Sequence, residues 1–263
     1  MTNAYICIVA VAPMRAEAAH RSEMVSQLLL GELAEELQAS GDFVQVRARY
    51  DGYEGWVQRS QLAVVEVGPH DQSAVVLAAG QQPLLVDGVA VPAGPGSELF
   101  FKAVDRQLLN RQGLQAGVHQ LVYPADWQLL ESMAPAAAEV AVAAAHGYLG
   151  VPYLWGGKSR AGIDCSGLVQ MAFKQAGMFV PRDAWQQAEG GDVVAFLAEA
   201  RPGDLAFFDN EEGRITHVGM LLGPQRILHA SGVVRIDPID HAGIVHAQTG
   251  KRTHQLRVIK RFF

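Results

Sequence analysis

Short apolar runs separated by glycine and aspartate fill residues 1–66. "YICIVAVA" is a continuous apolar strand pattern, "DFVQVRARY" alternates apolar and polar positions, and "DGYEGWVQ" is a turn that leads into a further strand. The Asp51-Gly52 pair predicts a tight hairpin turn, because glycine adopts positive φ without steric cost. "SEMVSQLLLGE" has the apolar spacing of a helical turn but equally fits an irregular strand. Short strands at such close spacing predict a small β-barrel.

Residues 67–132 continue in the same manner. "SAVVLAA", "QPLLVDGVAVP", "SELFFKA" and "GVHQLVYP" are apolar runs separated by glycine, proline and aspartate. They predict a second small β-barrel. The two stretches share no close sequence repeat, so a duplication is not demonstrated.

The pattern changes near Met133. "APAAAEVAVAAAHGYLG" is rich in alanine, with Pro135 at the expected helix start and Gly147 near its end. A glycine-rich turn follows, and then the strands "DLAFFD", "ITHVGMLL", "RILHAS" and "QLRVIKRF". Helices followed by an antiparallel sheet predict an α+β domain over residues 133–263. The 263-residue chain is therefore expected to hold two small β-barrel domains and one α+β domain.

Composition and charge exclude several classes of protein. The net charge of −6 and the absence of a Lys/Arg run argue against a nucleic-acid partner. No segment reaches the ~18 to 20 apolar residues that a membrane span needs. "AYICIVAVAP" has no basic residue before a short apolar run, so a first strand explains it better than a signal peptide. We expect a soluble, cytoplasmic protein of unknown oligomeric state.

Cys165 lies where a helix is expected to begin, in "GGKSRAGIDCSGLVQMAF". Asp164 is the predicted N-cap, Leu168 and Phe173 belong to the predicted buried face, and Gly177 ends the helix. Unpaired N–H groups and the helix dipole in the first turn favour a thiolate, which is the nucleophilic form of cysteine. Position alone leaves a reactive and a structural cysteine equally open.

Two histidines flank a predicted hairpin turn at "GPQ". His217 in "ITHVGMLL" and His229 in "RILHAS" would then lie on one face of the sheet, opposite or diagonal to each other. A cysteine, a histidine base such as His217 and a group that holds its ring, such as His229, form the arrangement of a thiol hydrolase. The alternatives are satisfied structural histidines, or a Cys/His/His zinc site, which no C-x-x-C or H-E-x-x-H spacing supports. The other histidines are expected to be structural or surface residues; they include His146, His241, His246 and His254.

Four motifs taken in order carry a family resemblance. "PYLWGGKSRAGIDCSGLVQ", "GDLAFF", "HVGMLL" and "ILHASG" resemble the NlpC family of bacterial cell-wall cysteine endopeptidases, which have a papain-like fold. Two Src-homology-3-like domains ahead of the catalytic domain resemble the γ-D-glutamyl-diamino acid peptidases of that family. Those enzymes cut the bond that joins the side-chain carboxyl of D-glutamate to diaminopimelate or lysine.

The resemblance implies roles for four catalytic residues. Cys165 becomes the nucleophile, His217 the base and His229 the third polar residue. Tyr153, twelve residues before the cysteine, matches a tyrosine placed to hydrogen-bond near the oxyanion. The backbone N–H of Cys165 would be the second oxyanion donor. The resemblance implies no metal and no organic cofactor.

The resemblance also implies substrate-binding residues. Asp164 and Ser166 match positions that touch the D-glutamyl portion, although both would also serve as helix caps. Trp155 is also expected to bind substrate. Asp183 in "PRDAWQQ" is positioned to receive the amino terminus of the peptide. Ala184 stands where many relatives carry serine, which puts the details of specificity in doubt.

Two further substrate contacts are expected from the first domain. "HRSEMVSQLLLGE" and "DGYEGW" are similar to the first domain of enzymes that act on free muropeptides. There an acid and a tyrosine reach the free α-amine of L-alanine, and the candidates here are Glu23 and Tyr53. Glu17 is an alternative to Glu23, and both acids are equally consistent with solvated surface charges.

The sequence therefore predicts a cytoplasmic cysteine peptidase of murein recycling. Its partner would be a small murein peptide, L-Ala-γ-D-Glu-diamino acid, with no nucleic acid and no membrane involved. The alternatives are an exported hydrolase that cuts intact peptidoglycan and a catalytically inactive protein that binds murein peptides.

Overall fold

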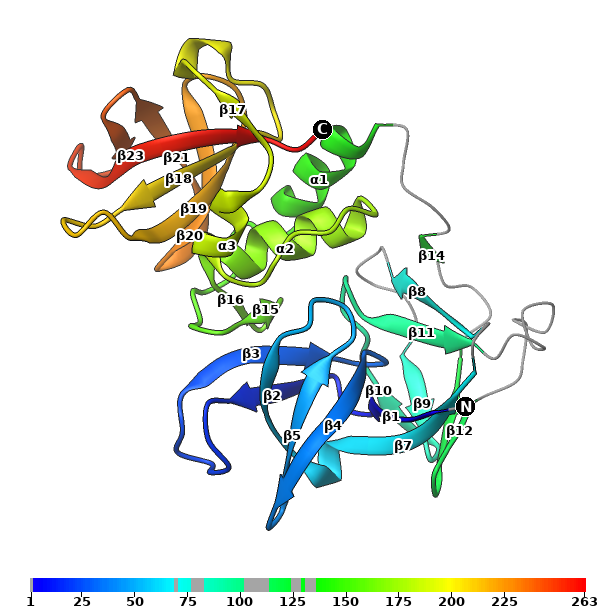
Figure 1. Cartoon of the computed structure of the whole chain (residues 1–263). Coiled ribbons are helices and arrows are strands. Elements are labelled where there is room, and N and C mark those ends of the chain that lie inside the picture. The colour runs from blue at the N-terminus through cyan, green and yellow to red at the C-terminus, as the bar shows by residue number, and fades with distance from the viewer. Residues whose placement is uncertain (1, 69–70, 77–82, 102–113, 124–128, 131–135) are drawn as a thin grey trace. The chain divides into compact units, whose positions relative to one another are not determined.

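The computed structural model describes residues 2–68, 71–76, 83–101, 114–123, 129–130 and 136–263, which divide between two compact units (Figure 1). The units are Met1–Glu131 and Ser132–Phe263. The division lies close to the predicted start of the third domain at residue 133. Pro135, the predicted first residue of the alanine-rich helix, lies outside the described residues.

An antiparallel sheet of seven strands begins the first unit. Its strands, in the order in which they pair, are β3 (Met24–Leu29), β2 (Val11–Arg15), β6 (Glu54–Gln58), β5 (Phe43–Ala48), β4 (Leu33–Ser40), β1 (Thr2–Cys7) and β7 (Leu62–Val67). A short 3₁₀ helix, η1 (Arg59–Gln61), precedes β7. The first apolar run was predicted as one strand, but it is divided: β1 ends at Cys7, residues 8–10 belong to no strand, and β2 begins at Val11. "SEMVSQLLLGE" contains the strand β3 rather than a helical turn.

The predicted hairpin at Asp51-Gly52 exists, but its turn is longer than expected. Five residues, 49–53, separate β5 from β6, and Gly52 has a φ of +72°. The Asp51 carboxylate accepts a hydrogen bond of 3.0 Å from the backbone N–H of Tyr53. This local side-chain bond stabilises the wider loop, as aspartate commonly does in turns.

Two smaller sheets form the rest of the first unit. Four strands pair in the order β10 (Val89–Val91), β9 (Leu84–Val86), β13 (His119–Val122) and β12 (Leu114–Ala116). Three strands pair in the order β11 (Glu98–Phe101), β8 (Gln72–Val76) and β14 (Leu129–Leu130). Ile6 of β1 and Leu84 and Leu121 of the four-stranded sheet belong to one buried apolar cluster. The two predicted barrels therefore share a core within one unit.

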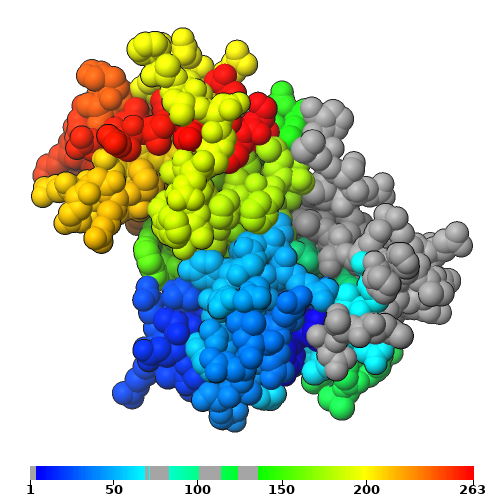
Figure 2. Space-filling view, in the orientation of Figure 1, coloured from blue at the N-terminus to red at the C-terminus, as the bar shows by residue number. Residues whose placement is uncertain are grey.

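The second unit contains a seven-stranded antiparallel sheet with helices on one side (Figure 1). Its strands pair in the order β17 (Asp192–Val194), β23 (Arg252–Arg261), β18 (Leu205–Asp209), β19 (Ile215–Leu221), β20 (Arg226–Ser231), β21 (Val233–Asp240) and β22 (Gly243–Val245). Because β22 also pairs with β23, six of these strands close into a barrel. A two-stranded ribbon of β15 (Lys158–Ser159) and β16 (Gly162–Ile163) precedes the sheet in the chain, and β23 lies at the surface of the unit (Figure 2, red).

The helices are α1 (Ala137–His146), α2 (Cys165–Gln175), α3 (Ala184–Glu189) and the 3₁₀ helix η2 (Leu197–Glu199). All eleven residues of α2 are buried, which is more than the one-sided burial predicted from its sequence. The reason is that α2 packs between α1, whose face toward the core is alanine, and the strands β19 and β20. Phe173 also packs against Phe262 and Phe263, with ring centroids 5.6 and 4.9 Å away. Gly177, with a φ of +75°, follows the end of the helix as predicted.

Candidate active site

The first turn of α2 positions Cys165. Asp164 is the N-cap, as predicted, and its Oδ1 accepts a hydrogen bond of 2.7 Å from the backbone N–H of Gly167. Gly167 has no room for a side chain, because a Cβ there would lie 2.3 Å from the carbonyl oxygen of Gly157. This close approach explains the glycine that follows the Cys165-Ser166 pair.

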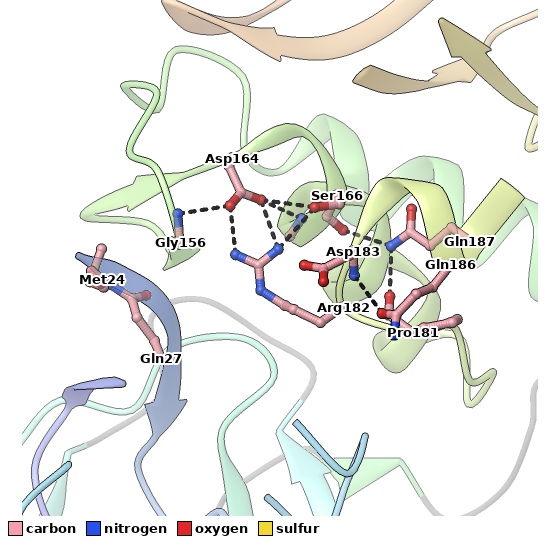
Figure 3. Close-up of polar contacts among 11 residues, drawn as sticks. Met24, Gln27, Gly156, Asp164, Ser166, Pro181, Arg182, Asp183, Gln186 and Gln187 are labelled. Carbon is pink, nitrogen blue, oxygen red and sulfur yellow. Dashed lines mark hydrogen bonds and ion pairs between the residues drawn. The ribbon is translucent and has the colours of Figure 1, made fainter. Parts of the chain in front are cut away.

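Asp164 is also the centre of a buried ionic network (Figure 3). The Arg182 guanidinium donates to both oxygens of this carboxylate, at 3.0 and 2.6 Å, and to the Ser166 hydroxyl at 2.9 Å. The backbone N–H of Gly156 donates to Oδ2 at 2.9 Å. A bidentate arginine–carboxylate pair of this kind is both strong and geometrically specific. It fixes the glycine-rich turn and the start of α2 in one arrangement.

This network bears on the substrate roles expected of Asp164 and Ser166. Both carboxylate oxygens of Asp164 accept hydrogen bonds from the protein, and the Ser166 hydroxyl lies between Asp164 and Arg182. The structure thus gives both residues a positioning role, and their contact with substrate stays a prediction. Sequence reasoning missed Arg182. The signal was its place in "PRDAWQQ", beside the aspartate that was singled out.

The predicted hairpin brings His217 and His229 together. In β19 and β20, Met220 pairs with Leu228 and Leu221 with Ile227, which makes the two histidines diagonal neighbours. His217 Nε2 and His229 Nδ1 lie 2.9 Å apart, within hydrogen-bond distance. A Cβ at Gly219 would lie 2.9 Å from the Cβ of His229. The missing side chain at Gly219 therefore leaves the space in which His229 lies.

Asp237 of β21 lies behind His229 and was missed by the sequence analysis. His229 Nε2 and Asp237 Oδ2 are 3.0 Å apart, and Arg235 Nε donates to the same oxygen at 2.8 Å. Both the His229 and the Asp237 side chains are fully buried. The sequence signal was the hairpin turn at "SG", which sets the register of β20 and β21. His229 pairs with Arg235, and Asp237, two positions further along β21, lies on the same face of the sheet as His229.

His254 of β23 packs against His217. It was predicted to be structural or at the surface, but its ring stacks on that of His217, with centroids 4.1 Å apart and an interplanar angle of 24°. The two residues are 37 positions apart in sequence, and their strands, β19 and β23, both pair with β18. No local pattern in the sequence could show this proximity.

The Cys165 thiol faces the strand that carries His217. The backbone N–H groups of Val218 and Ser166 hydrogen-bond to the sulfur, and Val218 directly follows His217 in β19. Burial nevertheless raises the pKa of Cys165 to about 11, with the Asp164 carboxylate adding to the effect. The expected thiolate is therefore not borne out, because loss of solvent outweighs the helix-terminal N–H groups.

The histidines of the site are neutral as well. Burial lowers the pKa of His217 well below its usual value, and the nearby His254, His229 and Arg235 add to the shift. Burial lowers the pKa of His229 to about 4, although the hydrogen bond to Asp237 opposes this. At neutral pH the site thus holds a thiol and uncharged imidazoles.

Tyr153 is half-buried near the thiol. Its backbone N–H donates to Gly232 at 2.9 Å. Burial raises the pKa of its hydroxyl, and electrostatic interaction with Cys165 and Asp164 raises it further, so Tyr153 stays a hydrogen-bond donor. Trp155, two residues on, is 60% exposed.

Asp183 begins α3 as its N-cap. Its backbone N–H donates to Gln186 Oε1 at 3.2 Å as part of a capping box. Ala184 is the first residue of α3 and is buried. The amino-terminus-binding role of Asp183 stays a prediction.

Glu23 and Tyr53 both lie in the first unit. Glu23 is exposed immediately before β3, and Tyr53 lies in the β5–β6 loop with its ring partly buried against the core. Their expected contact with substrate stays a prediction.

The alternative of a zinc site finds no support in the geometry. His217 Nε2 and His229 Nδ1 share a hydrogen bond, so their lone pairs do not converge on a common ion. Within the described part of the chain, no three His, Cys, Asp or Glu side chains are grouped to hold a metal.

Comparison with known proteins agrees with this geometry. The model of the NlpC/P60 family matches residues 150–253, which contain the cysteine, both hairpin histidines and Asp237. Residues 150–253 thus form an NlpC/P60 domain. The model of the bacterial dipeptidyl-peptidase Sh3 domain matches residues 14–62, so the first part of the chain is SH3-like. The predicted α+β, papain-like fold behind an SH3-like β domain is thus confirmed, while the second SH3-like barrel stays a prediction.

Several curated relatives match part of the chain. The γ-D-glutamyl-L-lysine dipeptidyl-peptidase of Bacillus subtilis is 48% identical over 85 residues, which cover 32% of this chain and 28% of that protein. The chain spans 27% to 33% of the length of the first relatives that it matches. Dipeptidyl-peptidase 6 of Lysinibacillus sphaericus is 28% identical over 251 residues, 86% of this chain and 87% of that protein.

A solved structure resembles the whole chain. The crystal structure of an NlpC/P60 family protein from Bacillus cereus has a TM-score of 0.77 at 20% identity and covers 98% of this chain and 99% of its own. This likeness establishes the fold.

None of the described helices combines the length and apolar character needed to cross a membrane.

Proposed function

We propose that the chain is a cysteine peptidase that hydrolyses the γ-D-glutamyl-diamino acid bond of free murein peptides with an amino-terminal L-alanine. The observation that carries the proposal is the Cys165 thiol, held at the start of α2 against the strand of His217 in an NlpC/P60 domain. His217 in turn is hydrogen-bonded to His229. This is the arrangement that a thiol nucleophile with a general base requires.

Because the Cys165 thiol and the His217 imidazole are both neutral before the reaction, proton transfer accompanies the attack on the substrate. As the Cys165 sulfur attacks the γ-carbonyl carbon, its proton moves to the His217 imidazole and the carbonyl oxygen becomes an oxyanion. The imidazolium then gives this proton to the nitrogen of the diamino acid, the C–N bond breaks, and a thioester remains. Water, deprotonated by His217, attacks the thioester, and the thiol leaves with the proton restored.

Two donors are available for the oxyanion. The Tyr153 hydroxyl remains protonated because of its raised pKa. The N–H of Cys165 is at the first position of α2, where the helix itself offers no acceptor. Preorganised donors of this kind are commonly the largest contribution to acyl-transfer catalysis.

The substrate class rests on the relatives and on the first unit. One relative is named a γ-D-glutamyl-L-lysine dipeptidyl-peptidase, and the matching SH3 model is that of bacterial dipeptidyl-peptidases. A dipeptidyl-peptidase must recognise a free amino terminus. We propose Asp183 for this role, because a carboxylate binds an ammonium group strongly. Glu23 and Tyr53 of the first unit are separate candidates for it. A role in cytoplasmic murein recycling follows from this substrate.

Product analysis tests the proposal. We expect L-Ala-γ-D-Glu-diaminopimelate and L-Ala-γ-D-Glu-L-Lys to be cleaved after D-Glu, with slower cleavage once the L-alanine amine is acetylated. Efficient digestion of intact sacculi, with no effect of acetylation, would instead indicate a hydrolase of polymeric wall. No cleavage of any of these by a folded protein would indicate a binding protein.

A further inference from the structure

Three polar side chains form a line that leads away from the thiol. His217 Nε2 is 2.9 Å from His229 Nδ1, and His229 Nε2 is 3.0 Å from Asp237 Oδ2. His217 therefore contacts His229 through Nε2, and His229 contacts Asp237 through Nε2. His217 Nδ1 is the remaining ring nitrogen of His217, and the backbone N–H of the next residue, Val218, hydrogen-bonds to the Cys165 sulfur.

The protonation of each nitrogen follows from Asp237. A carboxylate only accepts hydrogen bonds, so His229 Nε2 must carry a proton. A neutral imidazole has one N–H, which leaves His229 Nδ1 as an acceptor. His217 Nε2 must therefore carry the N–H of that ring, and His217 Nδ1 has a free lone pair.

From this line we propose that Asp237 is a positioning residue, which acts through His229 to keep His217 in the tautomer that can accept the Cys165 proton. The inference rests on the proposed function for its catalytic consequence. Its structural content, the position of two protons, does not depend on any substrate. Asp237 itself touches neither the thiol nor the scissile bond.

Without an acceptor at position 237, nothing determines which of the two histidines donates the hydrogen bond to the other. His229 could place its N–H on Nδ1 and donate to His217 Nε2. His217 would then carry its proton on Nδ1 and could not take another from the thiol while neutral. His229 alone therefore does not fix the tautomer of His217, because a neutral histidine can both donate and accept a hydrogen bond.

The surroundings of Asp237 keep it an acceptor. Arg235 Nε donates to Oδ2 at 2.8 Å, and the backbone N–H of Ala247 donates to Oδ1 at 3.0 Å. Burial raises the pKa of Asp237, but the hydrogen bonds from Arg235, Ala247 and His229 together leave it below its usual value. Arg235 is itself held by a hydrogen bond to the carbonyl of Ser231. The carboxylate is thus charged and fixed in place.

The ring nitrogens can be observed directly by ¹⁵N NMR of histidine-labelled protein, with assignments from His217→Gln and His229→Gln. In the wild-type protein at pH 7 we expect His217 and His229 to be protonated on Nε2 and bare on Nδ1. A proton on Nδ1 of His217, or a bare Nε2 on His229, would overturn the proposal. This measurement needs no variant of Asp237 and no activity.

Substitutions of Asp237 then test its role. In Asp237→Ala we expect the Nδ1 and Nε2 signals of both rings to show mixed tautomers, and kcat to fall about tenfold or more with KM within about twofold. In Asp237→Asn the amide oxygen can face two donors, Arg235 and His229, so this variant should keep the tautomer and recover part of kcat. Asp240→Asn is the matched control, because Asp240 lies on the same strand but pairs with the exposed Arg252.

The outcomes separate this inference from the proposed function. The predicted nitrogen pattern in a protein that cleaves no murein peptide would refute the function and leave the tautomer assignment standing. Cleavage by the wild type together with unchanged nitrogen signals and unchanged kcat in folded Asp237→Ala would refute the inference alone. A loss of kcat in Asp240→Asn equal to that in Asp237→Ala would also refute it.

Discussion

At the scale of single residues, the environment of Cys165 decides how the site reacts. The start of a helix favours a thiolate, but here the sulfur is buried and has the Asp164 carboxylate nearby, so its pKa rises to about 11. The pKa of His217 is lowered at the same time, mainly by burial. Proton transfer therefore accompanies attack instead of preceding it.

Alkylation of Cys165 by a small thiol reagent should depend steeply on pH. Below a pKa of about 11 the thiolate fraction rises about tenfold for each pH unit, so the rate should keep rising from pH 6 to pH 9. Mass spectrometry of the modified peptide measures the rate, and Cys165→Ala gives the background from Cys7. A rate that is constant over this range would show a preformed thiolate–imidazolium pair.

His229 should make the second unit sensitive to acid. Its pKa is about 4 in the folded protein and about 6.5 when unfolded, so the unfolded state binds the proton more tightly. Stability is then lost as the pH falls from about 6.5 toward 4, by about 2 kcal/mol between pH 7 and pH 5. Urea unfolding at both pH values measures it, and His229→Gln should lose less. An equal loss in this variant would place the titrating group elsewhere.

At the scale of elements, the site depends on the start of α2 and on the β19–β20 hairpin. Both were predictable, because a helix cap and the parity of a hairpin are local properties of the sequence. Asp237, His254 and Arg182 were not predicted as parts of the site. They reach it through the pairing of β21 with β20, the pairing of β23 with β18, and a loop that folds back onto Asp164. These contacts are non-local and leave little trace in the sequence.

Arg182 should matter for stability more than for chemistry. Arg182→Met leaves the buried Asp164 carboxylate without its partner, which should destabilise the second unit by about 3 to 5 kcal/mol. Urea denaturation measures this loss, and the double variant with Asp164→Asn should recover part of it. Arg252→Met, which breaks the exposed pair with Asp240, is the control and should change stability little. Equal effects of the two single variants would contradict the structural role of Arg182.

At the scale of the whole molecule, the chain joins an SH3-like unit to an NlpC/P60 unit. The division into β-rich and α+β parts was predictable from the change in pattern near residue 133. The shared core of the first unit was not, because apolar runs do not show which sheet they pack against. Glu23, an exposed acid of the first unit, is proposed to recognise the amino terminus of the substrate.

Substitution of Glu23 tests this recognition. In Glu23→Gln we expect the KM for L-Ala-γ-D-Glu-L-Lys to rise about tenfold, because the ammonium loses a charged acceptor, while cleavage of the acetylated peptide stays unchanged. Glu17→Gln is the matched control. The effect in Glu17→Gln alone would transfer the role to Glu17, and no effect in either variant would remove the first-unit acid from the proposal.

The most direct measurement of the central claim is the trapping of the acyl-enzyme. The protein is mixed with L-Ala-γ-D-Glu-L-Lys, quenched in acid within one turnover, digested and analysed by mass spectrometry. The account predicts an L-Ala-γ-D-Glu thioester on the peptide that contains Cys165, and neither adduct nor product in Cys165→Ala. Product formation by Cys165→Ala at the wild-type rate would contradict it.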